Sequence, residues 1–411
     1  MGSTDGAYVG IDISSRNTVL SIYNSNMEEP ATISTILGEE NYSIPTVLAK
    51  RLGMGQWFFG DDALRMSRLK EAVLVEELYN LALRDGQVVI DAETYGARDL
   101  LVIFFKKLFS IPGPMAALGD IEKLVICVEQ ISLEVMELMN YVASKLGIDQ
   151  NHVTLIDRSE CFYYYALSQK PELFLYNVAL FDYSGNNMVS CTLNRNQSTR
   201  PQLITLNVIN HGEITDNRDE MFDEVITTAF GSSLFSSVYL VGDGFDGEWM
   251  KVSLSHLCKG RKVFLGKNLY SKGACYGGYI KDGKRDWPFI YIGDNDLKLN
   301  LSIKILDNNV MKFFTLIDAG ESWYDVKGEC EVILDGEPEI EFFIQRPESR
   351  EAHSEVLELT DMPKRENRTT RLRIEARPVS DVAVAITITD LGFGEISAAS
   401  GKSWEHTITT K

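Results

Sequence analysis

Residues 8–23 of the chain read YVGIDISSRNTVLSIY. An apolar run ends at Asp12, a short polar turn follows, and an alternating run then resumes. Two such runs separated by a few turn residues predict a β-hairpin. The sequence therefore places a carboxylate at the mouth of a hairpin, where a side chain at the end of a buried strand is available for binding.

The same pattern occurs a second time, in residues 177–194, which read NVALFDYSGNNMVSCTLN. Asp182 takes the position that Asp12 has in the first copy, and the turn is again built of small polar residues. A repeated unit of this kind indicates a pseudo-duplication. Because strand-like and helix-like stretches follow each copy, residues 1–280 are predicted to form two related α/β halves.

Paired hairpins of this kind suit phosphate chemistry. A tight turn of small residues directs several backbone N–H groups one way and so forms an anion cradle. An aspartate at each strand end then holds a hydrated magnesium ion between the two turns, next to a triphosphate. For either hairpin alone, an ordinary turn with Asp is the simpler explanation. The second matching copy favours the phosphate interpretation.

A third segment, residues 236–257, reads SSVYLVGDGFDGEWMKVSLSHL and passes from a strand through Gly242, Asp243 and Gly244 into a helical pattern. Glycines between a strand and a helix allow a flat ligand such as a nucleoside to approach the backbone. Alone this signal is weak, but ligands of α/β folds bind where such loops converge.

Composition restricts the class of protein. The 411 residues are 45% hydrophobic, which is enough for two or three domains. A formal net charge of -19 argues against nucleic-acid binding. Six scattered cysteines without a C-x-x-C pair predict reduced thiols and a cytoplasmic location. The five histidines lie far apart, so no zinc site is expected. Neither a signal peptide nor a membrane-spanning run is found, and no membrane partner is expected.

In their order these segments resemble the actin-like ATPases, and among them most closely the Hsp70 chaperones. GIDISSRNT (10–18) resembles the first phosphate motif and LFDYSGNNMVSCTL (180–193) the second. LVGDGFDGEWMKV (240–252) is similar to the adenosine motif, and NLYSKGACYGG (268–278) to the segment that closes the domain. The strands and helices expected to connect the two halves match at 124–132 and 152–167.

The resemblance implies an α/β actin-like ATPase fold with two pseudo-duplicated ribonuclease H-like lobes in residues 1–285, the second lobe having a reduced insert. It also implies ATP or ADP with magnesium as the ligand, with Asp12 and Asp182 as the metal ligands. The residues expected to bind the nucleotide are Asp12, Ser14, Ser15, Arg16, Arg158, Asp182, Ser184, Gly185, Asn186, Gly242, Asp243 and Gly244.

The chain differs from the family pattern at several positions that carry the chemistry of the family. Arg158 stands where the family has an acidic residue, Val189 where a further aspartate is usual, and no match to the catalytic lysine is found. No catalytic residue is therefore assigned, and the chain is expected to be at most a weak ATPase. Arg16 and Arg158 have three possible placements: they bind phosphate as bidentate donors, they pair with Asp12 and Asp182 and fill the site, or they face solvent.

The sequence pattern changes in residues 286–411. There, short runs that alternate between apolar and polar residues are separated by Gly, Asp, Asn and Pro. This pattern predicts an all-β sandwich domain. LELTDMP (357–363) and VAVAITITDLGFGEI (382–396) resemble the peptide-binding β-domain of Hsp70 proteins, without its helical lid. The resemblance implies that an extended peptide or protein segment binds there by strand addition. KRENRTTRLR (364–373) is either a site for an acidic partner or a solvated strand and turn.

Taken together, the sequence predicts an Hsp70-like, chaperone-type protein that binds peptide or partner segments and has weak or regulatory nucleotide binding. A first alternative is a catalytically silent pseudo-ATPase scaffold. A second, a sugar or acetate kinase, is disfavoured because the segments between the halves offer no obvious catalytic acid. The oligomeric state cannot be read from these patterns.

Overall fold

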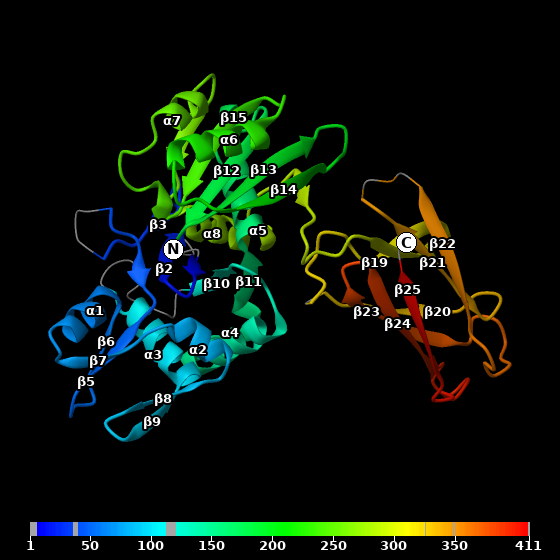
Figure 1. Cartoon of the computed structure of the whole chain (residues 1–411). Helices are drawn as coiled ribbons and strands as arrows, with labels where there is room; N and C mark the ends of the chain where they lie inside the picture. The colour runs from blue at the N-terminus through cyan, green and yellow to red at the C-terminus, as the bar shows by residue number, and fades with distance from the viewer. Residues whose placement is uncertain are drawn as a thin grey trace. The chain divides into compact units, whose positions relative to one another are not determined.

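The computed structural model describes residues 6–35, 40–111, 121–324, 326–347, 349 and 351–409 (Figure 1). The chain divides into two compact units, the first formed by Met1–Asn194 with Leu206–Trp287, and the second by Arg195–Thr205 with Pro288–Lys411. The structure of each unit is described by itself.

The first unit contains a six-stranded sheet that is built around the first hairpin. Its strand order is β11-β10-β1-β2-β3, and β4 also pairs with β2. β1 runs antiparallel to β2 and parallel to β10, which in turn runs parallel to β11. Most residues of β1 and β2 are buried, as expected for strands covered on both faces. The bounds are β1 Ala7–Ile13, β2 Asn17–Tyr23, β3 Ala31–Thr32, β4 Ile44–Pro45, β10 Ile121–Val128 and β11 Val153–Asp157.

A second six-stranded sheet is built in the same way around the second hairpin, in the order β16-β15-β12-β13-β14-β17. β12 runs antiparallel to β13 and parallel to β15. Asp12 pairs in register with Cys127 of β10, and Asp182 with Val241 of β15, so the two aspartates have equivalent positions. The bounds are β12 Asn177–Ser184, β13 Asn187–Asn196, β14 Gln202–Glu213, β15 Phe235–Val241, β16 Lys262–Leu265 and β17 Phe289–Tyr291.

The helices of the first unit cover these sheets. One core joins α2, α3 and α4 to the first sheet, and another joins α6 and α7 to the second. The α-helices are α1 Gly60–Arg68, α2 Leu78–Leu83, α3 Ala97–Phe109, α4 Leu133–Leu146, α5 Arg158–Ser168, α6 Arg218–Phe230, α7 Val252–Leu257 and α8 Leu269–Lys281. The 3₁₀ helices are η2 Gln150–His152, η3 Pro171–Leu173 and η4 Asp243–Phe245. Two small sheets complete the unit, one of β5 Leu48–Arg51, β6 Trp57–Phe59 and β7 Ala72–Val75, the other of β8 Gln87–Ile90 and β9 Glu93–Gly96.

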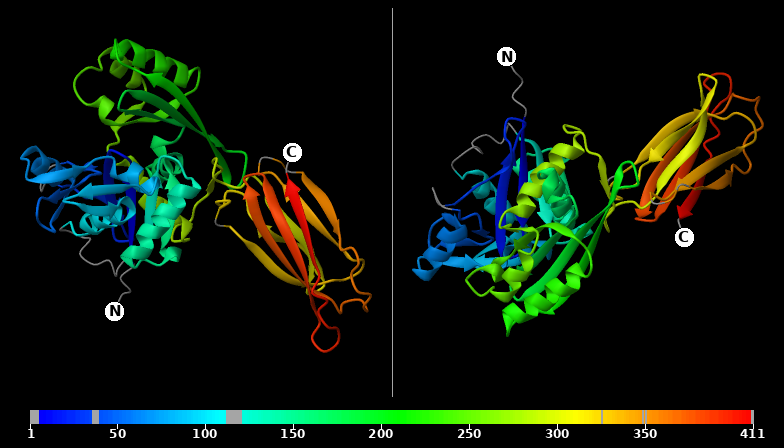
Figure 2. Two further views of the ribbon diagram at one scale, coloured as in Figure 1. Left: turned by 60° about the horizontal axis from the view of Figure 1, so that its bottom comes forward. Right: turned by 90° about the horizontal axis from the view of Figure 1, so that it is seen from above.

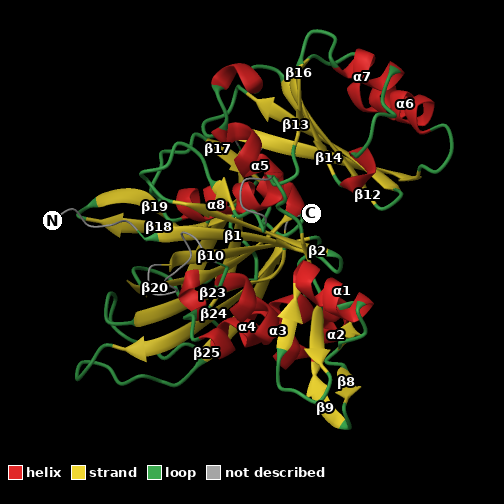
Figure 3. Cartoon of the chain, turned by 90° about the vertical axis from the view of Figure 1, so that its left-hand side faces the viewer, coloured by secondary structure: helices red, strands yellow, loops and turns green. Residues whose placement is uncertain are grey.

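The expected actin-like α/β fold with two pseudo-duplicated ribonuclease H-like lobes is wrong. Of the residues that the structure describes, strands hold 41% and helices 24%, in six separate sheets, so the architecture is β-rich (Figure 3). The structure differs from the expected fold because some of its helices are short and because it forms additional strands. α2 and α7 have only six residues each, and residues 87–96 form a two-stranded hairpin.

The packing of α8 against α5 gives a prediction for stability. A Cβ atom on Gly273 of α8 would lie 2.1 Å from the carbonyl oxygen of Cys161 in α5. Gly273→Ala is therefore expected to destabilise the chain by about 1–3 kcal/mol, because the two helices must separate. Gly55→Ala is the matched control, since a Cβ there meets nothing within 4 Å. Urea denaturation of both variants measures the difference in their free energy of unfolding. Equal stability of the two variants would show that α8 and α5 are not closely packed at Gly273.

Most of the second unit forms two four-stranded sheets, ordered β19-β18-β21-β22 and β20-β23-β24-β25 (Figure 2). Alternate residues of β24 are buried, in keeping with the period-two pattern of the sequence. One hydrophobic core is shared by the two sheets and includes Leu301, Phe342, Ile374 and Ile386. The bounds are β18 Asn300–Asp307, β19 Val310–Ile317, β20 Gly328–Ile333, β21 Glu339–Gln345, β22 Ala352–Glu358, β23 Arg371–Ser380, β24 Ala383–Gly392 and β25 Ser403–Thr409.

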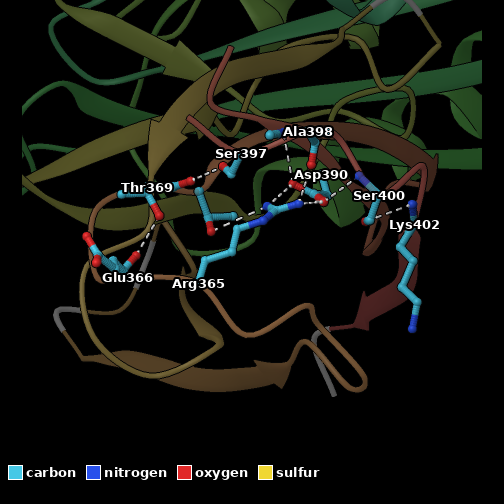
Figure 4. Close-up of polar contacts among 10 residues, drawn as sticks. Arg365, Glu366, Thr369, Asp390, Ser397, Ala398, Ser400 and Lys402 are labelled. Atoms are coloured by element: carbon cyan, nitrogen blue, oxygen red, sulfur yellow. Dashed lines mark hydrogen bonds and ion pairs between the residues drawn. The ribbon is translucent and has the colours of Figure 1, made fainter. Parts of the chain in front are cut away.

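A buried ion pair holds two segments of this unit together (Figure 4). Arg365 donates to both carboxylate oxygens of Asp390, at 2.7 and 2.8 Å, and the Asp390 side chain is fully buried. The other arginines of residues 364–373 are also paired within the chain, with Asp335, Glu331 and Glu329. The basic stretch is thus neutralised internally, which favours the solvated strand and turn over a site for an acidic partner.

Candidate functional site

The first unit contains a cavity of about 510 Å³ that collects most of the residues singled out in the sequence. Ten of the expected residues line it: Asp12, Ser14, Ser15, Arg16, Arg158, Asp182, Ser184, Gly185, Gly242 and Asp243. The other two, Asn186 and Gly244, line a second cavity of about 380 Å³, whose wall also includes Gly185 and Asp243. The structure therefore brings the two turns and the glycine loop to one place.

Arg158 lies between the two aspartates. Asp12 is near the end of β1, Asp182 is near the end of β12, and Arg158 is the first residue of α5. The Nε atom of Arg158 is 3.7 Å from Oδ1 of Asp12, and Nη1 is 3.6 Å from Oδ2 of Asp182. The three side chains are only 23%, 15% and 12% exposed for Arg158, Asp12 and Asp182. One guanidinium is thus shared by two largely buried carboxylates.

Tyr270, near the start of α8, completes this cluster. Its hydroxyl donates to Oδ2 of Asp182 at 2.9 Å, and its ring centroid is 5.1 Å from Cζ of Arg158. The Ser184 hydroxyl donates to the other oxygen of Asp182. Oδ1 of Asp12, by contrast, has no hydrogen-bond partner among the described residues. Its distance of 3.7 Å from Nε of Arg158 suits an ion pair but is too long for a hydrogen bond.

Burial governs the titration of the cluster. Burial raises the pKa of Asp12, and the nearby Arg158 opposes that rise only in part, while Asp182 adds to it. Burial lowers the pKa of Arg158, but Asp12, Tyr270 and Asp182 outweigh it, so the net pKa is above its ordinary value. Burial also raises the pKa of Tyr270, and the negative charge of Asp182 adds to the effect. Arg158 therefore stays charged, and Tyr270 stays a hydrogen-bond donor.

Several backbone N–H groups of the two turns have partners within the chain. In the first turn, Oγ of Ser14 accepts from the backbone N–H of Asn17 at 3.1 Å and of Arg16 at 3.4 Å. In the second turn, Oδ1 of Asp243 accepts from the backbone N–H of Gly185 at 2.9 Å. In each turn, an oxygen of the chain itself therefore accepts from part of the N–H groups that were expected to bind an anion.

The glycines of the site make room for protein atoms. Gly185 has a φ of 64°, and a Cβ there would lie 2.9 Å from Nη1 of Arg16, which reaches across from the first turn. A Cβ on Gly242 would lie 2.3 Å from the carbonyl oxygen of Tyr183, and one on Gly244 would lie 2.4 Å from the Tyr183 ring. The glycine loop therefore packs on Tyr183, where the sequence predicted close approach of a nucleoside.

The expected magnesium site does not suit the residues present. A divalent cation between Asp12 and Asp182 would compete with the guanidinium of Arg158, whose positive charge is held there by both carboxylates. Among the described residues, no three Asp, Glu, His or Cys side chains are arranged to hold a metal ion. No step of a reaction is therefore derived through magnesium.

Sequence reasoning missed two features of the cavity. Tyr270 was not singled out, although it lies within the quoted segment 268–278, because an aromatic residue at a helix start usually signals only packing. Lys267 forms an ion pair with Asp246 at 3.0 Å, and both residues line the cavity. No spacing in the sequence indicates that pair.

The chain is similar to two families of unknown function. A model described as "Family of unknown function (DUF5716) C-terminal" matches residues 29–294, and the chain belongs to this family. A model described as "Domain of unknown function (DUF8552)" matches residues 296–410. The chain matches no curated protein. Within the described ranges, no helix combines the length and the apolar character needed to cross a bilayer.

Proposed function

We propose that this chain is a catalytically silent binding protein, in which the guanidinium of Arg158 occupies the place between two aspartates that a metal ion would take. The observation that carries the proposal is the guanidinium of Arg158 between Asp12 and Asp182. Phosphoryl transfer depends on a positioned metal ion and on donors that cradle the phosphates. Here an arginine takes the place of the ion, and Ser14 and Asp243 take up the donors.

The expected weak or regulatory nucleotide binding is tested by thermal denaturation with ATP and ADP, each with magnesium. A ligand that binds the native state raises the melting temperature in a saturable way. The full-length protein is expected to show no such rise and no release of phosphate from ATP. A saturable rise that disappears in Asp182→Ala would instead support a nucleotide site and overturn the proposal.

A second candidate function is binding of an extended partner segment by the second unit. The observation that favours it is β19, which pairs only with β18 among the named strands. β19 exposes the apolar side chains of Val310, Met311 and Phe313, the last being 61% exposed. A strand with a free edge and exposed apolar residues is able to pair with an extended peptide.

Peptide-array binding with the full chain tests this candidate. Phe313→Ser is expected to reduce capture of extended apolar peptides on the order of tenfold, because a large exposed aromatic contact is lost. Ile396→Ser is the control, since Ile396 is exposed but lies outside the named strands. If no peptide in a diverse array is captured, the second unit does not bind peptides.

The expected cytoplasmic location rests on the cysteine pattern and stays a proposal. All six cysteines are free in the structure. Thiol labelling of the protein in its native compartment tests the location, because six reactive thiols after denaturation are expected for a reducing compartment. Disulfides found in the isolated native protein would contradict it.

A further inference from the structure

The outward face of one sheet of the second unit carries a group of exposed apolar side chains. In this sheet, β19-β18-β21-β22, Phe342 and Ile344 of β21 point into the core. Because side chains alternate along a strand, the residues between them point outward. The apolar side chains of the outward face are Leu306 of β18, Met311 and Phe313 of β19, Phe343 of β21 and Val356 of β22. Apart from Phe343, they are 48–61% exposed.

The strand register places these side chains next to one another. Leu306 pairs with Met311 across β18 and β19, and the ring centroids of Phe313 and Phe343 are 4.9 Å apart. Val356 lies diagonally opposite Phe343 on β22, within reach of an aromatic side chain. The five residues therefore form one apolar patch across all four strands, and exposed patches of this kind mark interaction sites.

Unpaired carboxylates lie along one side of the apolar patch. They belong to Glu339 and Glu341 of β21 and to Glu358 of β22, and all three residues are exposed. None of them forms an ion pair with another described residue. Glu339 pairs directly with Glu358 in the strand register, where like charges repel each other. Against these three carboxylates, the outward positions of the four strands offer one cation, Lys304.

The negative charge continues into a cavity of about 710 Å³, which lies where β21 begins and β22 ends. Glu339 and Glu358 are part of its lining, which contains five carboxylates and three cations in all. Two of these cations, Arg365 and Arg368, are already paired with aspartates outside the lining. The cavity therefore adds further carboxylates that have no cation of the chain to balance them.

We propose that the apolar patch and the three glutamates beside it form a docking surface for a basic, amphipathic helix of a partner protein. The apolar side of such a helix packs on Phe313 and Phe343, and its lysine or arginine side chains meet the glutamates. A helix fits a sheet face because it satisfies its own backbone hydrogen bonds, while those of the strands are used in the sheet. The net charge of -19 also attracts a basic partner at long range.

A second copy of the chain is not the expected occupant of this docking surface. In a two-fold symmetric contact the same surface lies on both sides, so the glutamates of one copy would approach those of the other. Like charges that face each other disfavour such a contact. The inference goes beyond the proposed function, because it uses neither the Arg158 cluster nor the free edge of β19.

Designed helical peptides test the proposal with the full-length chain, by fluorescence anisotropy of a labelled peptide. The first peptide has an apolar stripe flanked by lysines, and the second has glutamates in place of those lysines. The third has the composition of the first in an order without a stripe. Only the first is expected to bind saturably, with an affinity that falls as salt screens the charges. Absence of this binding, or equal binding of either other peptide, would overturn the proposal.

A charge reversal places the peptide on the docking surface. Glu341→Lys is expected to weaken binding of the basic peptide about tenfold or more, because an attraction becomes a repulsion. Glu405→Lys is the matched control, since Glu405 is an exposed residue of β25 in the other sheet. Unchanged affinity in Glu341→Lys would contradict the docking surface.

A second charge reversal separates a role in binding from a role in folding. Glu358→Lys removes the repulsion between Glu339 and Glu358, so the melting temperature is expected to stay the same or to rise. The affinity for the basic peptide is nevertheless expected to fall, because the docking surface loses a carboxylate. If this variant binds the peptide as tightly as the unchanged protein, the glutamates do not contact the partner and the proposal falls.

The same variants distinguish the docking surface from peptide binding at the edge of β19. Pairing with the edge strand involves Phe313 but not Glu341, which lies on β21. A basic peptide that loses affinity in Phe313→Ser and keeps it in Glu341→Lys would show binding at the edge and would overturn the docking surface. Loss of affinity in both variants is the result that the docking surface predicts.

Discussion

Asp390→Ala is expected to destabilise the second unit by about 3–5 kcal/mol, because it leaves the guanidinium of Arg365 buried without its counter-ion. The Asp390 side chain accepts two hydrogen bonds from Arg365 and one each from the backbone N–H groups of Gly392 and Ser400. Those two backbone donors lose their partner as well. The expected change is a large share of the stability of an ordinary domain.

Urea denaturation, followed by a probe in the second unit, measures this effect. Asp335→Ala is the control, because it removes the partner of Arg368 in an exposed ion pair of the same unit, with a distance of 2.7 Å. The control is expected to change stability little, as exposed pairs usually do. Equal effects of the two substitutions would show that burial of the Arg365–Asp390 pair adds nothing to the free energy of unfolding.

The same ion pair makes the stability of the second unit depend on pH. Hydrogen bonds from Arg365 lower the pKa of Asp390, burial opposes them, and the N–H groups of Ser400 and Gly392 add to the lowering. Because the folded pKa lies below the unfolded one, the contribution is fully present at neutral pH and is lost as the pH falls below about 4. In Asp390→Asn this part of the acid loss is expected to vanish, which a series of urea denaturations at decreasing pH measures.

The second large effect is expected from Arg158→Ala. The substitution leaves Asp12 and Asp182 facing each other without a counter-ion, which is expected to destabilise the first unit by about 3–5 kcal/mol in the absence of divalent ions. The pKa of Asp12, which burial already raises, is expected to rise further. Two carboxylates freed in this way provide oxygen ligands that a hard divalent cation prefers.

Titration with magnesium or manganese separates this explanation from a simple loss of packing. The melting temperature of Arg158→Ala is expected to rise in a saturable way with either ion, while that of the unchanged protein does not. Arg158→Lys keeps one positive charge and is expected to respond to neither ion. If Arg158→Ala is as stable as the unchanged protein without metal, the ion cluster contributes no stability.

The two hairpins could be predicted from the sequence, because each combines strand periodicity with a short polar turn. β1 with β2 and β12 with β13 form antiparallel pairs, as predicted. The alternating runs after residue 286 also form strands, including β23 and β24. The balance of helix and strand could not be predicted, since order along the chain does not determine whether a short segment such as residues 87–96 pairs as a hairpin.

Which charged groups meet could not be read from the sequence either. The spacing left three placements open for Arg158, and only the folded position of this first residue of α5, within 4 Å of both aspartates, selects pairing with both. Asp243 was expected to bind a ligand, but its carboxylate is taken up by the backbone of Gly185. Contacts between segments so distant in sequence depend on tertiary packing, which no local pattern encodes.

Crystals soaked in manganese test most directly whether the cleft carries its own cation, since the anomalous signal of the metal locates it independently of the protein density. For the unchanged protein, the expected result is guanidinium density of Arg158 between Asp12 and Asp182 and no manganese peak there. A manganese peak between the two carboxylates, with Arg158 displaced, would contradict the internal neutralisation of the site.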